Sequence, residues 1–289
     1  MSDCDERGTS EEHRANNVQM TTLHLTMPAT AGRAVWAALA GPDTRAAGAL
    51  GPDEVPDGRP VRLAGAWLRD TELGVGDSER LCPGAAEAVS ARLRALGASE
   101  VRVVLDVRRQ DRLMEHAHLQ LIQAGGTGEF AEQFPASAVL DWAALAERVA
   151  AVPGVAEVVL RPVEEFGERP VALAADLLRT AGITGLTTEE APAPLTYTAR
   201  GLVVARAMNA HLVSEEECAL AREFVGDLLP GPSAGNLFLE PDARSAILSG
   251  HAEANRKMFR TWLPDRPEDG YLTDQGTAAL AARNEREHG

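Results

Sequence analysis

The stretch Val101–Gln120 constrains the fold of this chain more than any other. It begins with an apolar run rich in β-branched residues, VRVVLDV, and then changes to a 3.6-residue period at Leu113, Met114, Ala117 and Leu121. Apolar runs of this kind are typical of strands buried on both faces of a parallel sheet, and the new period is typical of a helix. The stretch therefore predicts a buried parallel strand that leads directly into a helix.

Arg108 and Arg109 stand at the junction between this strand and this helix, with Asp111 close behind them. In open α/β sheets ligands bind beyond the carboxyl ends of the strands, and helix N-termini favour anions. Because a guanidinium group matches the geometry of a tetrahedral oxyanion, the pair predicts a phosphate or sulfate site. Position alone leaves an alternative equally open, in which the two arginines are solvated or make structural ion pairs.

Strand and helix patterns alternate through the first 165 residues, and only helical patterns follow. We expect strands over 20–27, 72–76, 101–107 and 155–160, helices over 33–39, 84–96 and 141–152 and after Arg109, and a long loop over 41–66. Further helices are expected over 171–180, 199–212, 214–229 and 241–262. Gly97 is expected to end the helix over 84–96, Asp141 to cap the helix that follows it, and Ser214 and Glu217 to form a capping box. Such alternation predicts right-handed crossovers and a mainly parallel sheet.

Composition divides the chain into three parts. Residues 1–18 are polar and acidic, which predicts disorder. Residues 19–263 are expected to form a single α/β domain, with a sheet-forming half over 19–165 and a helical half over 166–263. The polar tail over 264–289 is expected to pack weakly or not at all.

The charge and the cysteines exclude several classes of function. The formal net charge of −15 argues against general binding to nucleic acid or to an anionic membrane, so any anion site has to be local. The three cysteines lie far apart without a C-x-x-C pair, which predicts neither a disulfide framework nor a zinc cluster. The acidic start lacks the features of a signal peptide, and no run of about 18 apolar residues occurs. We therefore expect a cytoplasmic protein without a membrane span.

Three segments resemble the sulfotransferase superfamily. HLTMPATAGR at 24–33 resembles the family's first strand and the loop His-x-Gly-x-x-Lys-Thr-Gly-Thr-Thr, which binds the 5′-phosphosulfate of 3′-phosphoadenosine-5′-phosphosulfate (PAPS). VGDSERL at 75–81 is similar to a Ser-x-Glu strand end. VRRQDRLMEH at 107–116 resembles the segment that holds the 3′-phosphate with an Arg and a Ser eight residues apart. The order of segments over 20–262 is similar to a bacterial branch often seen near glycan or natural-product genes.

This resemblance implies a P-loop-like three-layer α/β fold with a central, mainly parallel sheet and a helical C-terminal half. It also implies transfer of a sulfuryl group from PAPS to a hydroxyl or amine of a small molecule or glycan. The residues that would hold the 3′-phosphate are Arg108, Arg109 and His116. Those that would contact the 5′-phosphosulfate are Thr30, Gly32 and Arg33.

Sulfuryl transfer needs a base that takes the proton of the acceptor, and the candidates are Glu79 and His24. Glu79 follows a predicted strand, where the alternative is an exposed loop carboxylate. His24 lies inside the first strand, where a buried, hydrogen-bonded histidine is the more common case. His116 and His118 point to different sides of a helix, so no metal site is expected.

Two departures from the family pattern leave other functions open. Ala29 replaces the lysine that would neutralise the leaving oxygen, although Arg33, one helical turn onward, could supply that charge. His116 occupies the position of the serine. The alternatives are therefore a catalytically degenerate binding or partner protein, or an enzyme that uses the anion pocket for a different group transfer. The acceptor is not identified, and a homo-oligomer remains open.

Overall fold

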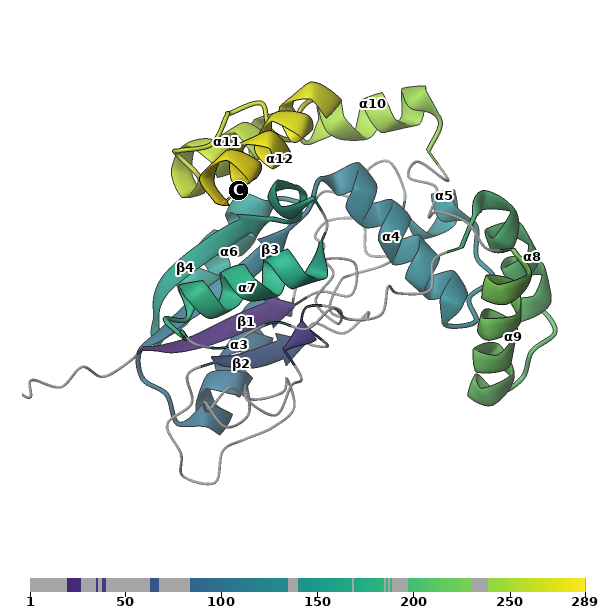
Figure 1. Ribbon diagram of the computed structural model, residues 1–289, viewed down its shortest axis with the longest axis horizontal. Coiled ribbons are helices and arrows are strands. Elements are labelled where there is room, and N and C mark those ends of the chain that lie inside the picture. Colours follow the sequence, from purple (N-terminus) through teal and green to yellow (C-terminus); the bar gives the residue numbers. More distant parts are fainter. Residues whose placement is uncertain are drawn as a thin grey trace, which may run out of the picture.

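A four-stranded parallel sheet forms the centre of the computed structural model (Figure 1). The structure describes residues 20–26, 35, 38–39, 63–67, 84–134, 140–167, 169–184, 186, 188, 197–229 and 239–288. The strands are β1 (Thr21–Thr26), β2 (Leu63–Trp67), β3 (Val101–Val107) and β4 (Val155–Pro162), in the spatial order β2-β1-β3-β4. The chain therefore has an α/β fold with a parallel sheet, as the alternating pattern predicted.

Successive side chains of a strand point to opposite faces of the sheet, and each face is covered by helices. On one face, Leu23, Leu25, Val103 and Leu105 pack in a cluster with helices α3 (Ala85–Leu96), α6 (Trp142–Ala150) and α11 (Ala252–Trp262). On the other face, Val104 and Leu63 pack with α7 (Pro170–Thr180) and with positions 35, 38 and 39. Strand β3 is thus buried on both sides, which explains its nearly continuous apolar sequence.

The remaining helices extend beyond the two faces of the sheet (Figure 1). They are α4 (Gln110–Gln123), α5 (Phe130–Gln133), α8 (Ala199–Asn209), α9 (Glu215–Leu228), α10 (Pro241–Gly250) and α12 (Asp274–His288), and a 3₁₀ turn, η2, covers Val163–Phe166. Within the described ranges, no helix combines the length and the hydropathy that crossing a membrane requires.

Local signals at the helix ends agree with the structure. The Asp141 side chain accepts a hydrogen bond from the Ala144 amide at 2.9 Å and caps α6. Ser214 and Glu217 form the predicted capping box of α9. Gly97 ends α3 with a left-handed backbone, φ 61°, which glycine adopts without strain. These predictions are confirmed.

Two predicted elements are wrong. The predicted loop over 41–66 contains the start of β2, a short strand whose small residues carry little strand signal and which forms because it pairs with β1. The predicted helix over 241–262 is two helices that meet at His251. The ring of His251 donates from Nδ1 to the carbonyl of Ile247 and accepts the amide of Leu140 at Nε2, so the break is buried and satisfied. The predicted disorder over 1–18 and the predicted strand over 72–76 fall outside the described residues and stay predictions.

The C-terminal segment packs against the core, so the prediction of a weakly packed tail is wrong. Tyr271 and Leu280 are fully buried, and the Tyr271 ring meets Phe259 edge to face with centroids 5.3 Å apart. Gly270 allows this approach, because a Cβ there would lie 2.6 Å from the Phe259 ring. The sequence did not reveal this packing, since only a few apolar side chains in a polar segment provide it.

We expect Tyr271→Ala to lower the free energy of unfolding by about 3–5 kcal/mol, the usual cost of removing a buried aromatic ring. Tyr271→Phe keeps the ring and removes only the hydroxyl, so its cost should be about 1–2 kcal/mol. Equilibrium urea unfolding of the full chain measures both values. A loss below about 0.5 kcal/mol for Tyr271→Ala, the range of an ordinary surface substitution, would show that the tail is not docked.

Candidate functional site

The carboxyl ends of β1 and β3 lie side by side, since Leu25 pairs with Leu105 in the parallel register. The chain leaves β1 over one face of the sheet, where positions 35, 38 and 39 pack, and reaches β3 over the other face through α3. The order of the strands therefore reverses between β1 and β3. Such a switch point leaves a crevice at the carboxyl ends of the two strands, which is where open α/β sheets bind ligands.

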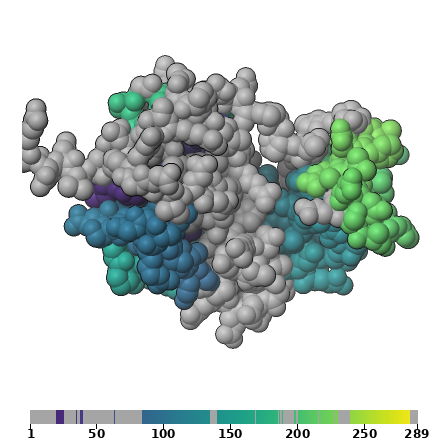
Figure 2. Space-filling model, turned by 90° about the horizontal axis from the view of Figure 1, so that it is seen from below, coloured from purple at the N-terminus to yellow at the C-terminus, as the bar shows by residue number. Residues whose placement is uncertain are grey.

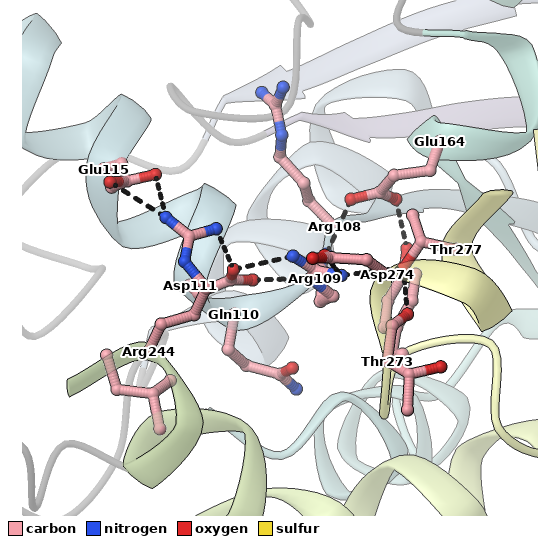
Figure 3. Close-up of polar contacts among 12 residues, drawn as sticks. Arg108, Arg109, Gln110, Asp111, Glu115, Glu164, Arg244, Thr273, Asp274 and Thr277 are labelled. Carbon is pink, nitrogen blue, oxygen red and sulfur yellow. Dashed lines mark hydrogen bonds and ion pairs between the residues drawn. The ribbon is translucent and has the colours of Figure 1, made fainter. Parts of the chain in front are cut away.

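Arg109 does not face this crevice as a free cation, because carboxylates enclose it (Figure 3). Its Nε and Nη2 donate to the two oxygens of Asp111 at 2.7 and 2.8 Å. Its Nη1 lies 2.7 Å from Asp274 Oδ1 and donates to Thr277 Oγ1 at 3.0 Å. Burial lowers the pKa of Arg109, but the hydrogen bonds and charges of Asp111 and Asp274 outweigh it and raise the pKa. These contacts are the structural ion pairs of the alternative, and the prediction that Arg109 holds a phosphate stays a prediction.

A second arginine extends this network to α10. Arg244 donates from Nη1 to Asp111 Oδ2 at 2.9 Å, and from Nη2 to the two oxygens of Glu115 at 3.3 and 3.4 Å. Figure 3 shows Arg244, Asp111 and Arg109 in one chain of ion pairs that leads on to Asp274. The network therefore joins the start of α4 to α10 and to the start of α12.

Arg108 takes a different direction from Arg109. In Figure 3 its side chain extends to the opposite side from the pair formed by Arg109 and Asp111. Only 2% of Arg108 is exposed, and its carbonyl accepts the indole N–H of Trp142 at 2.9 Å, which fixes the backbone at this position. The guanidinium of Arg108 therefore lies apart from Asp111 and Asp274, the two carboxylates that pair with Arg109.

Glu164 is a buried carboxyl next to Arg108 that the sequence did not single out as a site residue. Burial raises its pKa, and the charge of Arg108 and the hydrogen bonds it accepts offset this only in part. Its Oε1 accepts the amide of Arg109 at 2.9 Å, and its Oε2 lies 2.7 Å from the Tyr271 hydroxyl, which is also 3.0 Å from the Val107 carbonyl. One hydroxyl hydrogen cannot serve both acceptors. A protonated Glu164 satisfies all of these groups, because it donates to Tyr271 while Tyr271 donates to Val107.

His24 is part of a buried polar row across the sheet. Its Nε2 lies 2.8 Å from Asp106 Oδ2, and Asp106 Oδ1 accepts from Arg161 Nε and Nη2 at 2.9 and 2.6 Å. Burial lowers the pKa of His24, and the charge of Asp106 opposes this only in part. Because His24 is fully buried and its ring is bonded to Asp106, the structure favours the alternative of a buried, hydrogen-bonded histidine, and its role as a catalytic base stays a prediction.

The other predicted site residues stay predictions. Thr30, Gly32, Arg33 and Glu79 lie outside the described residues. His116 lies half-buried on α4. Within the part of the chain that the structure describes, no three or more His, Cys, Asp or Glu side chains are arranged to hold a metal ion.

Comparison with known proteins gives no match: no family model, no curated protein and no solved structure matches this chain. The chemistry of the site therefore has to be argued from its own residues.

Glu164 predicts a particular dependence of stability on pH. Its folded pKa lies above the ordinary value of 4.5, so the native state keeps the proton to higher pH than the unfolded state. Its contribution to stability is therefore full below about pH 4.5 and is lost as the pH rises through the folded pKa. In Glu164→Gln this loss cannot occur. We expect the stability of the parent relative to Glu164→Gln to fall from pH 4.5 upward, as measured by urea unfolding in a pH series. A constant or widening advantage of the parent would contradict the proton assignment.

Proposed function

We propose that the chain binds PAPS at the carboxyl ends of β1 and β3 and transfers its sulfuryl group to a hydroxyl or amine of a small molecule or glycan. The observation that carries this proposal is the place of Arg108. It directly follows β3, the strand beside β1 at the point where the strand order reverses, and it lies two residues before the 14-residue helix α4. Ligands bind at the carboxyl ends of the strands in open α/β sheets, and the start of a long helix favours an anion.

The arrangement of the sheet supports the finer reading of the fold as P-loop-like with three layers. Helices cover both faces, and the end of β1 at Thr26 lies next to the end of β3, which Arg108 follows. A nucleotide with phosphates at two positions can reach both. The identity of the nucleotide comes from the sequence resemblance.

The ion pairs of Arg109 change the proposed division of roles. Arg108, together with His116, holds the 3′-phosphate, whereas Arg109 is a positioning residue that fixes the junction of β3 and α4. Thr30, Gly32 and Arg33 contact the 5′-phosphosulfate. Glu79 takes the proton of the acceptor, because His24 is buried and bonded to Asp106.

In this reaction the acceptor oxygen or nitrogen forms a bond to sulfur while the bond from sulfur to the bridging oxygen of PAPS breaks. The second product is adenosine 3′,5′-bisphosphate, and Glu79 holds the acceptor proton. Arg33, one helical turn beyond the position of the missing lysine, supplies positive charge to the departing oxygen.

Calorimetry with adenosine 3′,5′-bisphosphate tests the binding step. We expect the parent to bind and Arg108→Gln to bind about 10–100-fold more weakly, the effect of losing a charge-assisted hydrogen bond to phosphate. The matched control is Arg256→Gln, a half-exposed arginine on α11, which should bind as the parent does. Circular dichroism confirms that each variant is folded. No heat from the folded parent at millimolar ligand, or equal affinity of parent and Arg108→Gln, would remove the proposal.

A second candidate function is a binding protein that retains the nucleotide site without transfer, and Ala29 favours it because the loop lysine is absent. In that case the parent binds PAPS but releases no adenosine 3′,5′-bisphosphate in the presence of hydroxyl and amine acceptors. Ala29→Lys should then raise the affinity for PAPS about tenfold, as one added charge pair near the phosphosulfate can. Release of product by the parent would instead exclude the binding-only function.

A further inference from the structure

The large exposed apolar side chains of the described residues are concentrated on one helical hairpin. They belong to α8, to α9 and to the turn that joins these helices: Val203, Val213, Leu220, Phe224 and Leu228. Figure 2 shows this hairpin in green at one end of the molecule. A gathering of this kind differs from the scattered apolar residues of an ordinary surface and marks an interaction surface.

Three of these residues form a stripe along α9. Leu220, Phe224 and Leu228 are spaced by four positions, so they lie above one another on one side of the helix. They are 62%, 54% and 59% exposed. The inner side of the same helix is buried through Ala221 and Val225, and Val225 packs with α8 and the end of α4. The stripe therefore belongs to a helix that already has its own core contacts, and it is not needed to dock the hairpin.

The charges beside the stripe are acidic. Glu216, Glu217 and Glu223 are exposed on α9, whereas its one basic residue, Arg222, is half-buried. Glu217 also caps the start of the helix. A second copy of this helix would bring like charges together, and an anionic membrane would repel them in the same way. The net charge of −15 on the chain acts in the same direction.

We propose that the stripe Leu220–Phe224–Leu228 binds a basic amphipathic helix of a partner protein. The partner places apolar side chains at helical spacing on the stripe and lysine or arginine side chains opposite Glu216 and Glu223. In this mode of recognition one amphipathic helix packs on the other, the apolar anchors supply affinity and the flanking charges select the partner. The stripe lies on α9, whereas the proposed nucleotide site lies at the carboxyl ends of β1 and β3. The partner helix and the nucleotide can therefore bind at the same time.

A fluorescent peptide of about 18 residues with a leucine face and a lysine face serves as the probe, and anisotropy with the full-length protein measures binding. We expect the parent to bind it, the double variant Leu220→Gln and Phe224→Gln to bind at least tenfold more weakly, and Glu216→Gln with Glu223→Gln to bind about fivefold more weakly. The matched control is Val213→Gln, which removes an exposed valine outside the stripe and should bind as the parent does. Glutamine at these exposed positions retains the helix.

Several results would overturn the proposal. Equal binding of the peptide to the parent and to the stripe variant would show attraction by overall charge alone. Tighter binding of a matching leucine–glutamate peptide would exclude a basic partner. Concentration-dependent dimerisation in sedimentation velocity that the stripe variant abolishes would identify a second copy as the occupant. Flotation of the parent, but not of the stripe variant, with vesicles of anionic lipid would identify a membrane.

Discussion

The ion pairs of the Arg109 guanidinium tie the C-terminal helix α12 to the start of α4. The guanidinium is fully buried, and Asp111 and Asp274 satisfy it from two directions. A buried charge of this kind is costly unless it is paired, so docking of the segment that carries Asp274 stabilises the start of α4. Asp274 lies 165 positions along the chain from Arg109, with which it pairs.

The same network separates the two arginines that follow β3. Adjacent residues at the end of a strand point in different directions. Here the Arg109 side chain lies between Asp111 and Asp274, and the Arg108 side chain extends to the opposite side (Figure 3). Arg109 therefore shapes the junction, and Arg108 provides the charge next to Glu164. The proposed nucleotide site depends on this separation of roles.

The sequence predicted the parts of the fold that local rules determine. The apolar runs of β3 and β4, the glycine end of α3 and the caps of α6 and α9 each depend on residues within a few positions, and all are present in the structure. It did not predict β2, whose small residues become a strand only beside β1, or the packing of Tyr271. Pairing and burial between distant segments leave no local pattern.

Prediction of the candidate site from the sequence was limited in the same way. The position of Arg108 and Arg109 at the end of a strand was correct, but the direction of each side chain was not predictable, because Asp274 and Arg244 contribute from far along the chain. His24 was correctly recognised as a candidate for burial, since an interior strand position offers no route to solvent.

The most direct test of the proposed function is a crystal structure of the protein with adenosine 3′,5′-bisphosphate. The account predicts ligand density at the carboxyl ends of β1 and β3, with the 3′-phosphate within hydrogen-bond distance of the Arg108 guanidinium and with Arg109 still paired to Asp111 and Asp274. Density at another place on the molecule, or a 3′-phosphate bound by Arg109 after its ion pairs have opened, would contradict it.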